Sequence, residues 1–234
     1  MRSVDEWSLE FDLLWNNIVS DKAPGLNEYE KSVFLTRAEE SVVVMLYNGG
    51  LGDAFESTEE LTHYLGTLVR QSVCPTATDV RVMAQTLTDK SKLYKNPSDM
   101  LFRTWESCRI TTGDCGDVDV AVTPVTQDEF WKTVRNPFKK QNSRKVLRLS
   151  FTRNTSASGT DYDNEVYSEL VSDFPIKRYT VRYLAKPEPI ILENLSGGLS
   201  INGKSEAMTC KLPEIIHQTI LVEAVKMAKA VWNT

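Results

Sequence analysis

The last third of the chain, residues 174–232, constrains the fold more than any other stretch. Within the sequence FPIKRYTVRYLAKPEPIIL, Tyr179, Val181 and Tyr183 alternate with polar residues, and this period of two predicts a strand. The later sequence KLPEIIHQTILVEAVKMAKAVW carries apolar residues at helical spacing, with a proline and a glutamate suited to a first turn. The chain is therefore expected to end on a strand, a turn and one amphipathic helix.

Two prolines, Pro187 and Pro189, interrupt the chain after the predicted strand. Neither has a backbone N–H, so the sheet ladder must stop or move to an edge before residues 190–192 resume it. A loose turn should follow, because glycine and asparagine are frequent turn residues. Its residues are Gly197, Gly198, Asn202 and Gly203.

Two helices are predicted near the start of the chain. Ser3 with Glu6 is a capping-box signature for the first, and Asn27 can cap the second, which glycines after residue 48 end. The first helix should have one apolar stripe, made of Trp7, Phe11, Leu14 and Ile18, with Trp15 at its margin. The apolar positions of the second are Val33, Phe34, Ala38, Val42, Met45 and Leu46.

These apolar faces also predict how the helices pack. The two N-terminal helices should pair through their apolar sides, and the C-terminal helix should pack back on the second of them. The contacts expected there join Ile216, Ile220 and Val225 to Phe34, Val42 and Met45.

The middle of the chain has the periodicity of strands. After a short helix expected at 58–65, apolar and β-branched runs occur at 69–73, 80–88, 100–112, 118–125, 146–151 and 162–170. Thr126 and Glu129 form a second capping-box signature, so one or two helical turns should follow them. The sequence thus predicts an α+β fold in which two N-terminal helices and the C-terminal helix pack together, with an inserted antiparallel β region. The expected domains are 1–56, helical; 57–192, mostly β; and 193–234, a turn and the C-terminal helix.

Composition places the chain among ordinary globular proteins, with 41% hydrophobic and 25% charged residues. No apolar run is long enough to cross a bilayer, and the sequence MRSVDEWSLE has no apolar signal core, so we expect a cytosolic product and no membrane partner. The cysteines are scattered at a spacing that matches no familiar zinc site, so free thiols are expected. They are Cys74, Cys108, Cys115 and Cys210.

Catalytic and metal-binding patterns are sparse. None of GxSxG, HExxH, GxxxxGK[ST] and GxGxxG is present, so we predict no enzymatic activity, no catalytic residue and no cofactor. His63 and His217 lack visible partners, which favours a surface or packing role for each. Asp114, Asp117 and Asp119 could wrap calcium, but a hairpin turn is favoured because their spacing fits no EF-hand.

A basic run, KTVRNPFKKQNSRKVLR at residues 132–148, contrasts with the acidic first 60 residues. Three roles are open for it: a solvated loop, a contact with the phosphate backbone of DNA, or docking on an acidic face of a neighbouring subunit, such as the N-terminal helices of the next copy. Sequence-specific recognition is not expected, because no helix-turn-helix, RRM or zinc-finger signature is present. The candidate subunit or DNA contacts are Arg135, Lys139, Lys140, Arg144 and Lys145.

Three blocks of sequence resemble virion proteins of tailed phages. They are NEYEKSVFLTRAEESVV near the N-terminus, VTPVTQDEFWKTVRNPFKKQNSRKVLRLSF in the middle, and IKRYTVRYLAKPEPIILENL followed by CKLPEIIHQTILVEAVKMAKA. They cover most of the chain in matching order, and RYTVRYLAKPEPIIL is the most distinctive part. The chain is most similar to a neck, or head-to-tail connector, protein of the crAss-like phages, a family with no active-site residues to carry over.

The resemblance implies a ring-forming subunit at the neck/tail junction of the virion, made in the host bacterial cytoplasm. The homo-oligomeric ring, of about twelve copies to match the portal, would extend the portal channel, retain packaged DNA and provide a tail attachment platform. Its partners would be the portal protein, adjacent neck or tail ring proteins, and passing double-stranded DNA, without sequence specificity. A head-to-tail ring joins two different faces of each subunit, so acidic helices and a basic run on one chain could guide its assembly.

Two alternatives come from other classes of protein. A sequence-nonspecific DNA-binding packaging accessory would use the basic run, and its binding would weaken steeply with salt. A hydrolase built around the acidic turn would be stabilised by a metal, and that stabilisation would be lost on Asp117→Ala.

Overall fold

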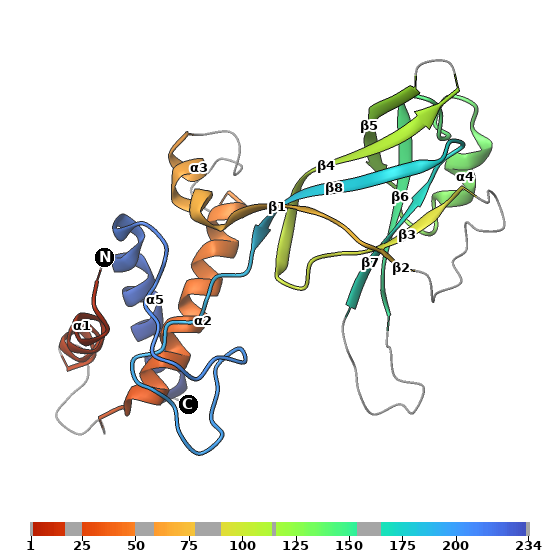
Figure 1. Cartoon of the computed structure of the whole chain (residues 1–234). Helices are drawn as coiled ribbons and strands as arrows, with labels where there is room; N and C mark the ends of the chain where they lie inside the picture. Colours follow the sequence, from red (N-terminus) through yellow and green to blue (C-terminus); the bar gives the residue numbers. More distant parts are fainter. Residues whose placement is uncertain are drawn as a thin grey trace. The chain divides into compact units, whose positions relative to one another are not determined.

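The computed structural model describes residues 2–16, 25–49, 59–77, 90–113, 116–153 and 165–232. They form two compact units, a helical unit of Met1–Leu68 with Lys186–Thr234 and a β unit of Val69–Ala185 (Figure 1). Helices together with a mixed, curled sheet make this an α+β fold, as predicted. That the chain divides into domains at 56 and 192 stays a prediction. The strand predicted at 80–88, and Ile18, lie outside the described residues.

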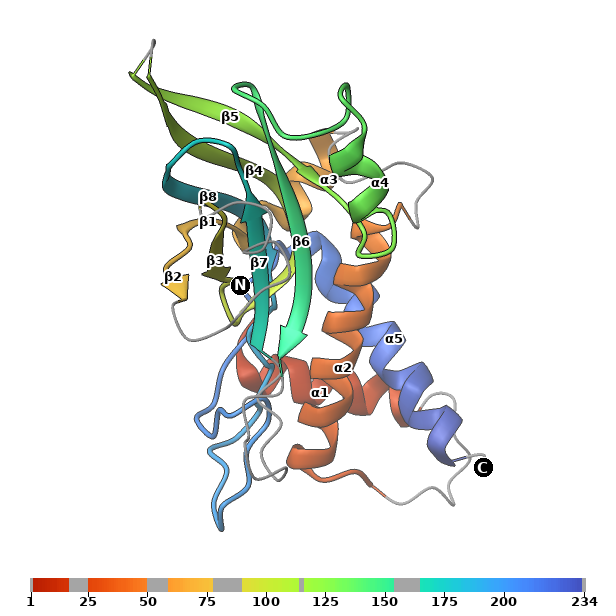
Figure 2. The same ribbon diagram turned by 90° about the vertical axis from the view of Figure 1, so that its right-hand side faces the viewer.

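The described helices of the helical unit are α1 Val4–Asn16, α2 Glu28–Tyr47, α3 Glu59–Leu65, the 3-10 turn η1 Gly66–Leu68 and α5 Glu214–Trp232. Both predicted caps are present, since Glu6 N–H donates to Ser3 Oγ at 3.2 Å and Glu30 N–H donates to Asn27 Oδ1 at 2.8 Å. As predicted, α5 packs on α2, and Figure 2 shows the two helices side by side. In contrast to the expected pairing of α1 with α2, α1 lies mainly against α5.

The buried stripe of α1 differs from the predicted one by one position. Trp7, Phe11 and Trp15 are buried, whereas Leu14 is only half-buried. The ring of Trp7 lies 5.0 Å from that of His217 on α5, so the aromatic stripe faces α5. An indole has more apolar area to bury than a leucine side chain, which explains why Trp15 and not Leu14 is central.

The buried face of α2 also differs from the predicted one. Met45 is exposed and Phe34 is half-buried, so neither is the core contact that was expected. Four polar residues of α2 are also buried, and a prediction based on apolar spacing alone could not include them. They are Lys31, Ser32, Thr36 and Glu39. The buried apolar residues of α2 are Leu35, Ala38, Val42, Val43 and Leu46.

Residues 190–192 do not resume the sheet, which corrects the prediction, but lie buried against α2. Ile190 N–H donates to Thr36 Oγ1 at 3.1 Å, and the Thr36 hydroxyl lies 3.2 Å from the Ile190 carbonyl oxygen that accepts from it. Leu192 N–H donates to Ser32 Oγ at 2.9 Å. Ile191 exchanges two backbone hydrogen bonds with Met208, both at 2.9 Å. An unpaired buried backbone group costs about 1–3 kcal/mol, so these hydroxyls and this backbone pair replace the ladder that Pro187 and Pro189 interrupt.

A carboxyl group lies in the interior of the helical unit. Glu39 is 1% exposed, and its Oε1 accepts a hydrogen bond from Cys210 Sγ at 3.1 Å. Its Oε2 has no hydrogen-bond partner in the part of the chain that the structure describes. Burial, together with the nearby charges of Glu40 and Glu188, raises the pKa of Glu39 to about 8.

The described strands of the β unit belong to one sheet. They are β1 Val69–Val73, β2 Thr76–Ala77, β3 Lys92–Lys95, β4 Met100–Thr112, β5 Gly116–Pro124, β6 Lys145–Arg153, β7 Glu165–Val171 and β8 Ile176–Ala185. Their order across the sheet is β1-β8-β4-β5-β6-β7-β3-β2. The end strands β1 and β2 are separated in the chain by only two residues, so the sheet must curl until its ends meet.

The two residues between β1 and β2, Cys74 and Pro75, take part in hydrogen bonds that join the ends of the sheet. Cys74 N–H donates to the carbonyl of Tyr179 on β8 at 2.9 Å, and Lys95 N–H on β3 donates to the carbonyl of Pro75 at 3.0 Å. The rings of Tyr94 on β3 and Tyr179 on β8 lie 5.3 Å apart in the buried core. A sheet joined in this way leaves little open edge on which another chain could add a strand.

One pair of strands is parallel, which corrects the prediction of an antiparallel region. β5 and β6 pair in parallel, residues 121–124 with 145–148, whereas the other described pairs are antiparallel. Parallel neighbours require a crossover connection, and the chain supplies one in the segment that contains α4 Phe130–Arg135. The prediction missed this because apolar and β-branched runs do not show by themselves whether neighbouring strands pair in parallel.

Replacing Ile220 with alanine should lower the free energy of unfolding by about 2–5 kcal/mol, because Ile220 of α5 is fully buried and the smaller side chain leaves a cavity. Ile215→Ala is the matched control on the same helix, since Ile215 is 66% exposed, and it should change stability by less than about 0.5 kcal/mol. Urea unfolding measures both variants. Equal effects would contradict the assignment of the buried face of α5.

The contribution of Glu39 to the stability of the protein should fall as pH rises from about 4.5 to about 8. The folded protein keeps the Glu39 proton up to a pKa of about 8, whereas the unfolded chain releases it near 4.5, so this contribution is complete below 4.5 and lost through 8. Glu39→Gln should remove this part of the pH dependence. Melting temperatures of both proteins across this range test it, and parallel curves for the two would contradict it.

Candidate interaction surface

Helix α4 holds the first part of the basic run against the sheet. Phe130 is buried, and it anchors α4 so that Trp131 and the basic residues after it face solvent. Helix α4 begins after Glu129, which makes no side-chain cap, so the capping box predicted from Thr126 is not formed. The buried partners of Phe130 lie on β6 and β7 and are Leu147, Leu149 and Val171.

A hydrogen-bonded turn follows α4 and presents Phe138. Asn136 organises it, because its Oδ1 accepts from Phe138 N–H at 3.0 Å and its carbonyl accepts from Lys139 N–H at 3.1 Å and Lys140 N–H at 3.0 Å. Lys145 Nζ reaches the Phe138 carbonyl at 3.4 Å. The side chain of Phe138 is nevertheless 91% exposed. The turn therefore holds an aromatic ring in solvent next to two lysines.

The candidate contact residues differ in solvent exposure and in the contacts they make within the chain. Lys145 is half-buried and takes part in the turn, whereas the other candidates are exposed. No exposed candidate forms an ion pair with a residue that the structure describes, so their charges are available to a partner. These residues are Arg135, Lys139, Lys140 and Arg144. We name them, with Trp131 and Phe138, the basic turn.

Arg148, at the end of the basic run, has a different environment. Its Nε lies 3.0 Å from Glu106 Oε2, and both side chains are mostly buried. Arg103 Nε lies 3.8 Å from the same oxygen. Tyr179 Oη donates to Glu106 Oε2 at 2.7 Å. Burial and the Glu106 charge raise the pKa of Tyr179 well above its ordinary value. Arg148 therefore stabilises the β unit and is not part of the basic turn.

The described part of the acidic turn uses its carboxylates within the sheet. Arg109 Nε donates to Asp119 Oδ1 at 2.9 Å, and Thr111 Oγ1 donates to Asp117 Oδ1 at 2.7 Å. The hydrogen bond from Arg109 also holds the pKa of Asp119 below its ordinary value. Asp114 lies outside the described residues. Among the described residues, no group of three or more His, Cys, Asp or Glu side chains could hold a metal ion.

The two histidines occupy different environments. His217 is buried, one of its ring nitrogens lies 2.9 Å from the Leu212 carbonyl oxygen, and burial lowers its pKa. His63 is exposed on α3. The described cysteines are buried free thiols, namely Cys74, Cys108 and Cys210. No helix in the described ranges has both the length and the apolar character to span a membrane.

The outward side of α1 is a second surface, and the sequence analysis missed it. Leu9 is 69% and Leu13 62% exposed, and their spacing of four residues places both on one helix face, opposite the buried aromatic stripe. A second apolar pair at helical spacing was the signal available in the sequence. Acidic residues flank the pair on both sides, and they are Asp5, Glu6, Glu10 and Asp12. We name this the acidic face of α1.

Two of the four carboxylates on the acidic face of α1 already have ion-pair partners. Asp12 pairs with Lys31 at 2.7 Å and Glu10 with Arg2 at 3.0 Å, whereas Asp5 forms no ion pair with a described residue. Hydrogen bonds from Ser3 hold the pKa of Glu6 below its ordinary value, so this carboxyl is ionised at neutral pH. The face thus carries net negative charge around an exposed apolar centre.

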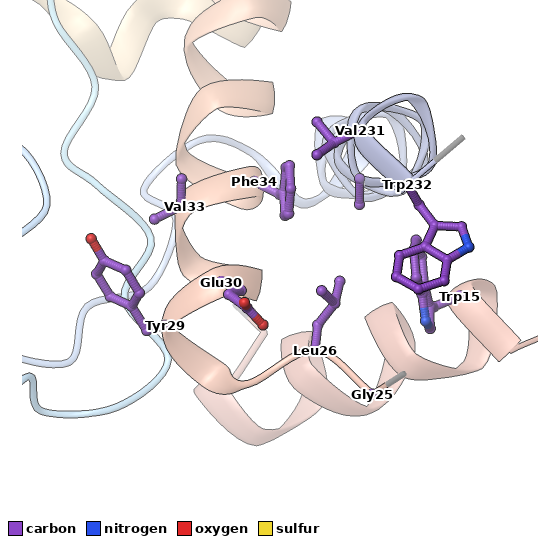
Figure 3. Close-up of a pocket in the computed structure, with 10 residues that line it drawn as sticks. Trp15, Gly25, Leu26, Tyr29, Glu30, Val33, Phe34, Val231 and Trp232 are labelled. Atoms are coloured by element: carbon purple, nitrogen blue, oxygen red, sulfur yellow. The ribbon is translucent and has the colours of Figure 1, made fainter. Parts of the chain in front are cut away.

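An apolar hollow of about 470 Å³ lies in the helical unit between the start of α2 and the end of α5 (Figure 3). Figure 3 shows Phe34 facing the end of α5 near Val231, and Trp15 beside Trp232. Phe34, predicted to contact the apolar face of the C-terminal helix in the core, instead lines this hollow at the end of α5.

Comparison with known proteins finds one family and two similar relatives. The sequence profile of a family described as phage tail ring protein 3/4 matches residues 2–234. The chain is 33% identical over 229 residues to Ring protein 3 of Bacteroides phage crAss001, which covers 95% of this chain and 93% of the relative. It is 33% identical over 245 residues to Ring protein 4/5 of the same phage, covering 99% of this chain and 94% of the relative.

Arg148→Ala should cost about 3 kcal/mol of stability, because it leaves the mostly buried Glu106 carboxylate without its nearest cation. Arg144→Ala is the matched control from the same basic run, and it should change stability by less than about 0.5 kcal/mol, because Arg144 is exposed and makes no ion pair with described residues. Guanidinium unfolding of both variants is the measurement. If Arg144→Ala were the more damaging change, this division of the basic run would be wrong.

Proposed function

This chain belongs to the phage tail ring protein 3/4 family, and from that membership we propose that it is a structural subunit of a homo-oligomeric ring at the neck/tail junction of the virion. The observation that carries the proposal is the match to ring proteins over nearly the whole chain. The role is structural and not enzymatic, in keeping with the names of both relatives.

Two surfaces of opposite charge support assembly into a ring. The basic turn lies in the β unit and the acidic face of α1 lies in the helical unit. A ring of identical subunits joined head to tail uses two different faces of each copy, and complementary charge can orient them. Each copy supplies one face of each sign.

The ring, as proposed, has about twelve copies to match the portal and extends the portal channel. It retains packaged DNA, provides a tail attachment platform, and contacts the portal protein and the neighbouring neck or tail rings. Double-stranded DNA passes through it without sequence-specific contacts, in agreement with a negative net charge of -5.

A DNA-binding packaging accessory is the second candidate function. The observation that favours it is the group of exposed basic residues without ion pairs to described residues, which could bind phosphates. Binding of random duplex DNA by the basic turn would weaken steeply as salt concentration rises.

The mass of the purified protein in solution tests the proposed ring. Light scattering or native mass spectrometry over a range of concentrations, with and without portal protein, should find a closed species of about twelve copies, either alone or only with the portal. A protein that stays monomeric or dimeric with the portal, and that shifts duplex DNA, would favour the packaging accessory instead.

A further inference from the structure

The basic turn and the acidic face of α1 have the same design with opposite charge. The basic turn presents Phe138, with Lys139 and Lys140 beside it in the chain. The acidic face presents Leu9 and Leu13 with carboxylates on either side. An apolar centre with a charged rim is the usual composition of a protein contact, in which the centre supplies binding energy and the rim supplies orientation.

We propose that the basic turn of one copy docks on the acidic face of α1 of the next copy, with Phe138 seated against Leu9 and Leu13. This contact is the heterologous interface of the ring, so it rests on the proposed function. It also assigns the role of the candidate residues, because Arg135, Lys139 and Lys140 then meet carboxylates of a neighbouring subunit and not phosphates.

The geometry of the turn supports this occupant. Phe138 is held by hydrogen bonds from its own N–H to Asn136 and from Lys145 to its carbonyl, so the ring is presented by an ordered turn at little cost in conformational entropy. Phe130, and not Phe138, anchors α4 on the sheet. Phe138 therefore has no structural role within the described β unit, whereas a contact with another copy would bury it.

The acidic face fits the same partner. Leu9 and Leu13 take no part in the packing of α1, which Trp7 and Phe11 provide from the other side of the helix. The carboxylates around the two leucines repel the phosphates of a DNA backbone, so a nucleic acid is unlikely to bind this face. A basic surface with an exposed aromatic ring complements both the charge and the apolar centre of this face. The basic turn of this chain is such a surface.

A charge-swap experiment on the full chain tests the contact. The turn variant is Lys139→Glu with Lys140→Glu, and the helix variant is Asp5→Lys with Glu10→Lys, which keeps Leu9 and Leu13 in place. Glu10 pairs with Arg2, whereas Lys139, Lys140 and Asp5 form no ion pair with a described residue. Each variant alone places like charges at every interface, so self-association should weaken by more than about tenfold. Mixed in equal amounts, the two variants can alternate around a ring in which every interface is complementary, and association should return.

Two controls accompany the swap. Lys204→Glu with Lys226→Glu makes the same change of charge at other exposed positions and should associate as the wild type does. Phe138→Ala should weaken association without lowering the melting temperature, because the ring is 91% exposed in the single chain. Circular dichroism confirms that every variant is folded.

Several results would overturn the contact. One is a turn variant that associates as well as the wild type, and another is a mixture that fails to recover. If a chain that carries both swaps associates normally while the mixture of the two variants does not, the two surfaces meet within one chain. If the turn variant loses binding to duplex DNA but self-associates as the wild type does, the basic turn binds DNA and not a neighbouring subunit. A wild-type protein that associates through these faces without closing a ring would contradict the proposed function and leave the contact standing.

Discussion

The helical unit depends on how it buries the backbone of residues 190–192 without a sheet. Two prolines end the strand before this segment. The hydroxyls of Ser32 and Thr36 on α2 then bind the N–H groups of Leu192 and Ile190 and the Ile190 carbonyl, while Ile191 pairs with the backbone of Met208. Because unpaired buried backbone groups are costly, these two hydroxyls fix where the returning chain lies on α2. The segment and the α5 helix after it complete the helical core, although 117 residues of the β unit separate them from α2 and its neighbours.

The same principle of satisfying strand backbone explains the β unit. Its sheet has β1 and β2 at opposite ends, and the two residues between them hydrogen-bond to β8 and β3, so the ends are joined. The parallel pairing of β5 with β6 requires a crossover, and that crossover is the segment that carries α4 and the basic turn. A topological requirement of the sheet thus places the charged surface that we propose as a subunit contact.

Much of the fold could be predicted from the sequence, because caps, prolines and apolar periods are local signals. Asn27, the prolines after β8 and the apolar spacing of α5 each gave the correct element. The features that were predicted wrongly depend on residues far away in the chain. Ser32 and Thr36 of α2 are buried because a distant segment needs their hydroxyls, and the parallel strand pair could not be recognised from strand periods. Arg148 resembled its basic neighbours in sequence, yet it pairs with Glu106, which is 42 residues away. The spacing of Leu9 and Leu13 could have predicted a second apolar face on α1. The prediction instead assigned only the stronger aromatic stripe.

The most direct test of the account is zero-length coupling of amines to carboxylates in assemblies made from equal amounts of nitrogen-14 and nitrogen-15 protein, with the coupled peptides read by mass spectrometry. The account predicts peptides of mixed label that join Lys139 or Lys140 to carboxylates of residues 5–12. Coupled peptides that always carry a single label, or lysines of the basic turn that couple only to other parts of the neighbouring copy, would contradict it.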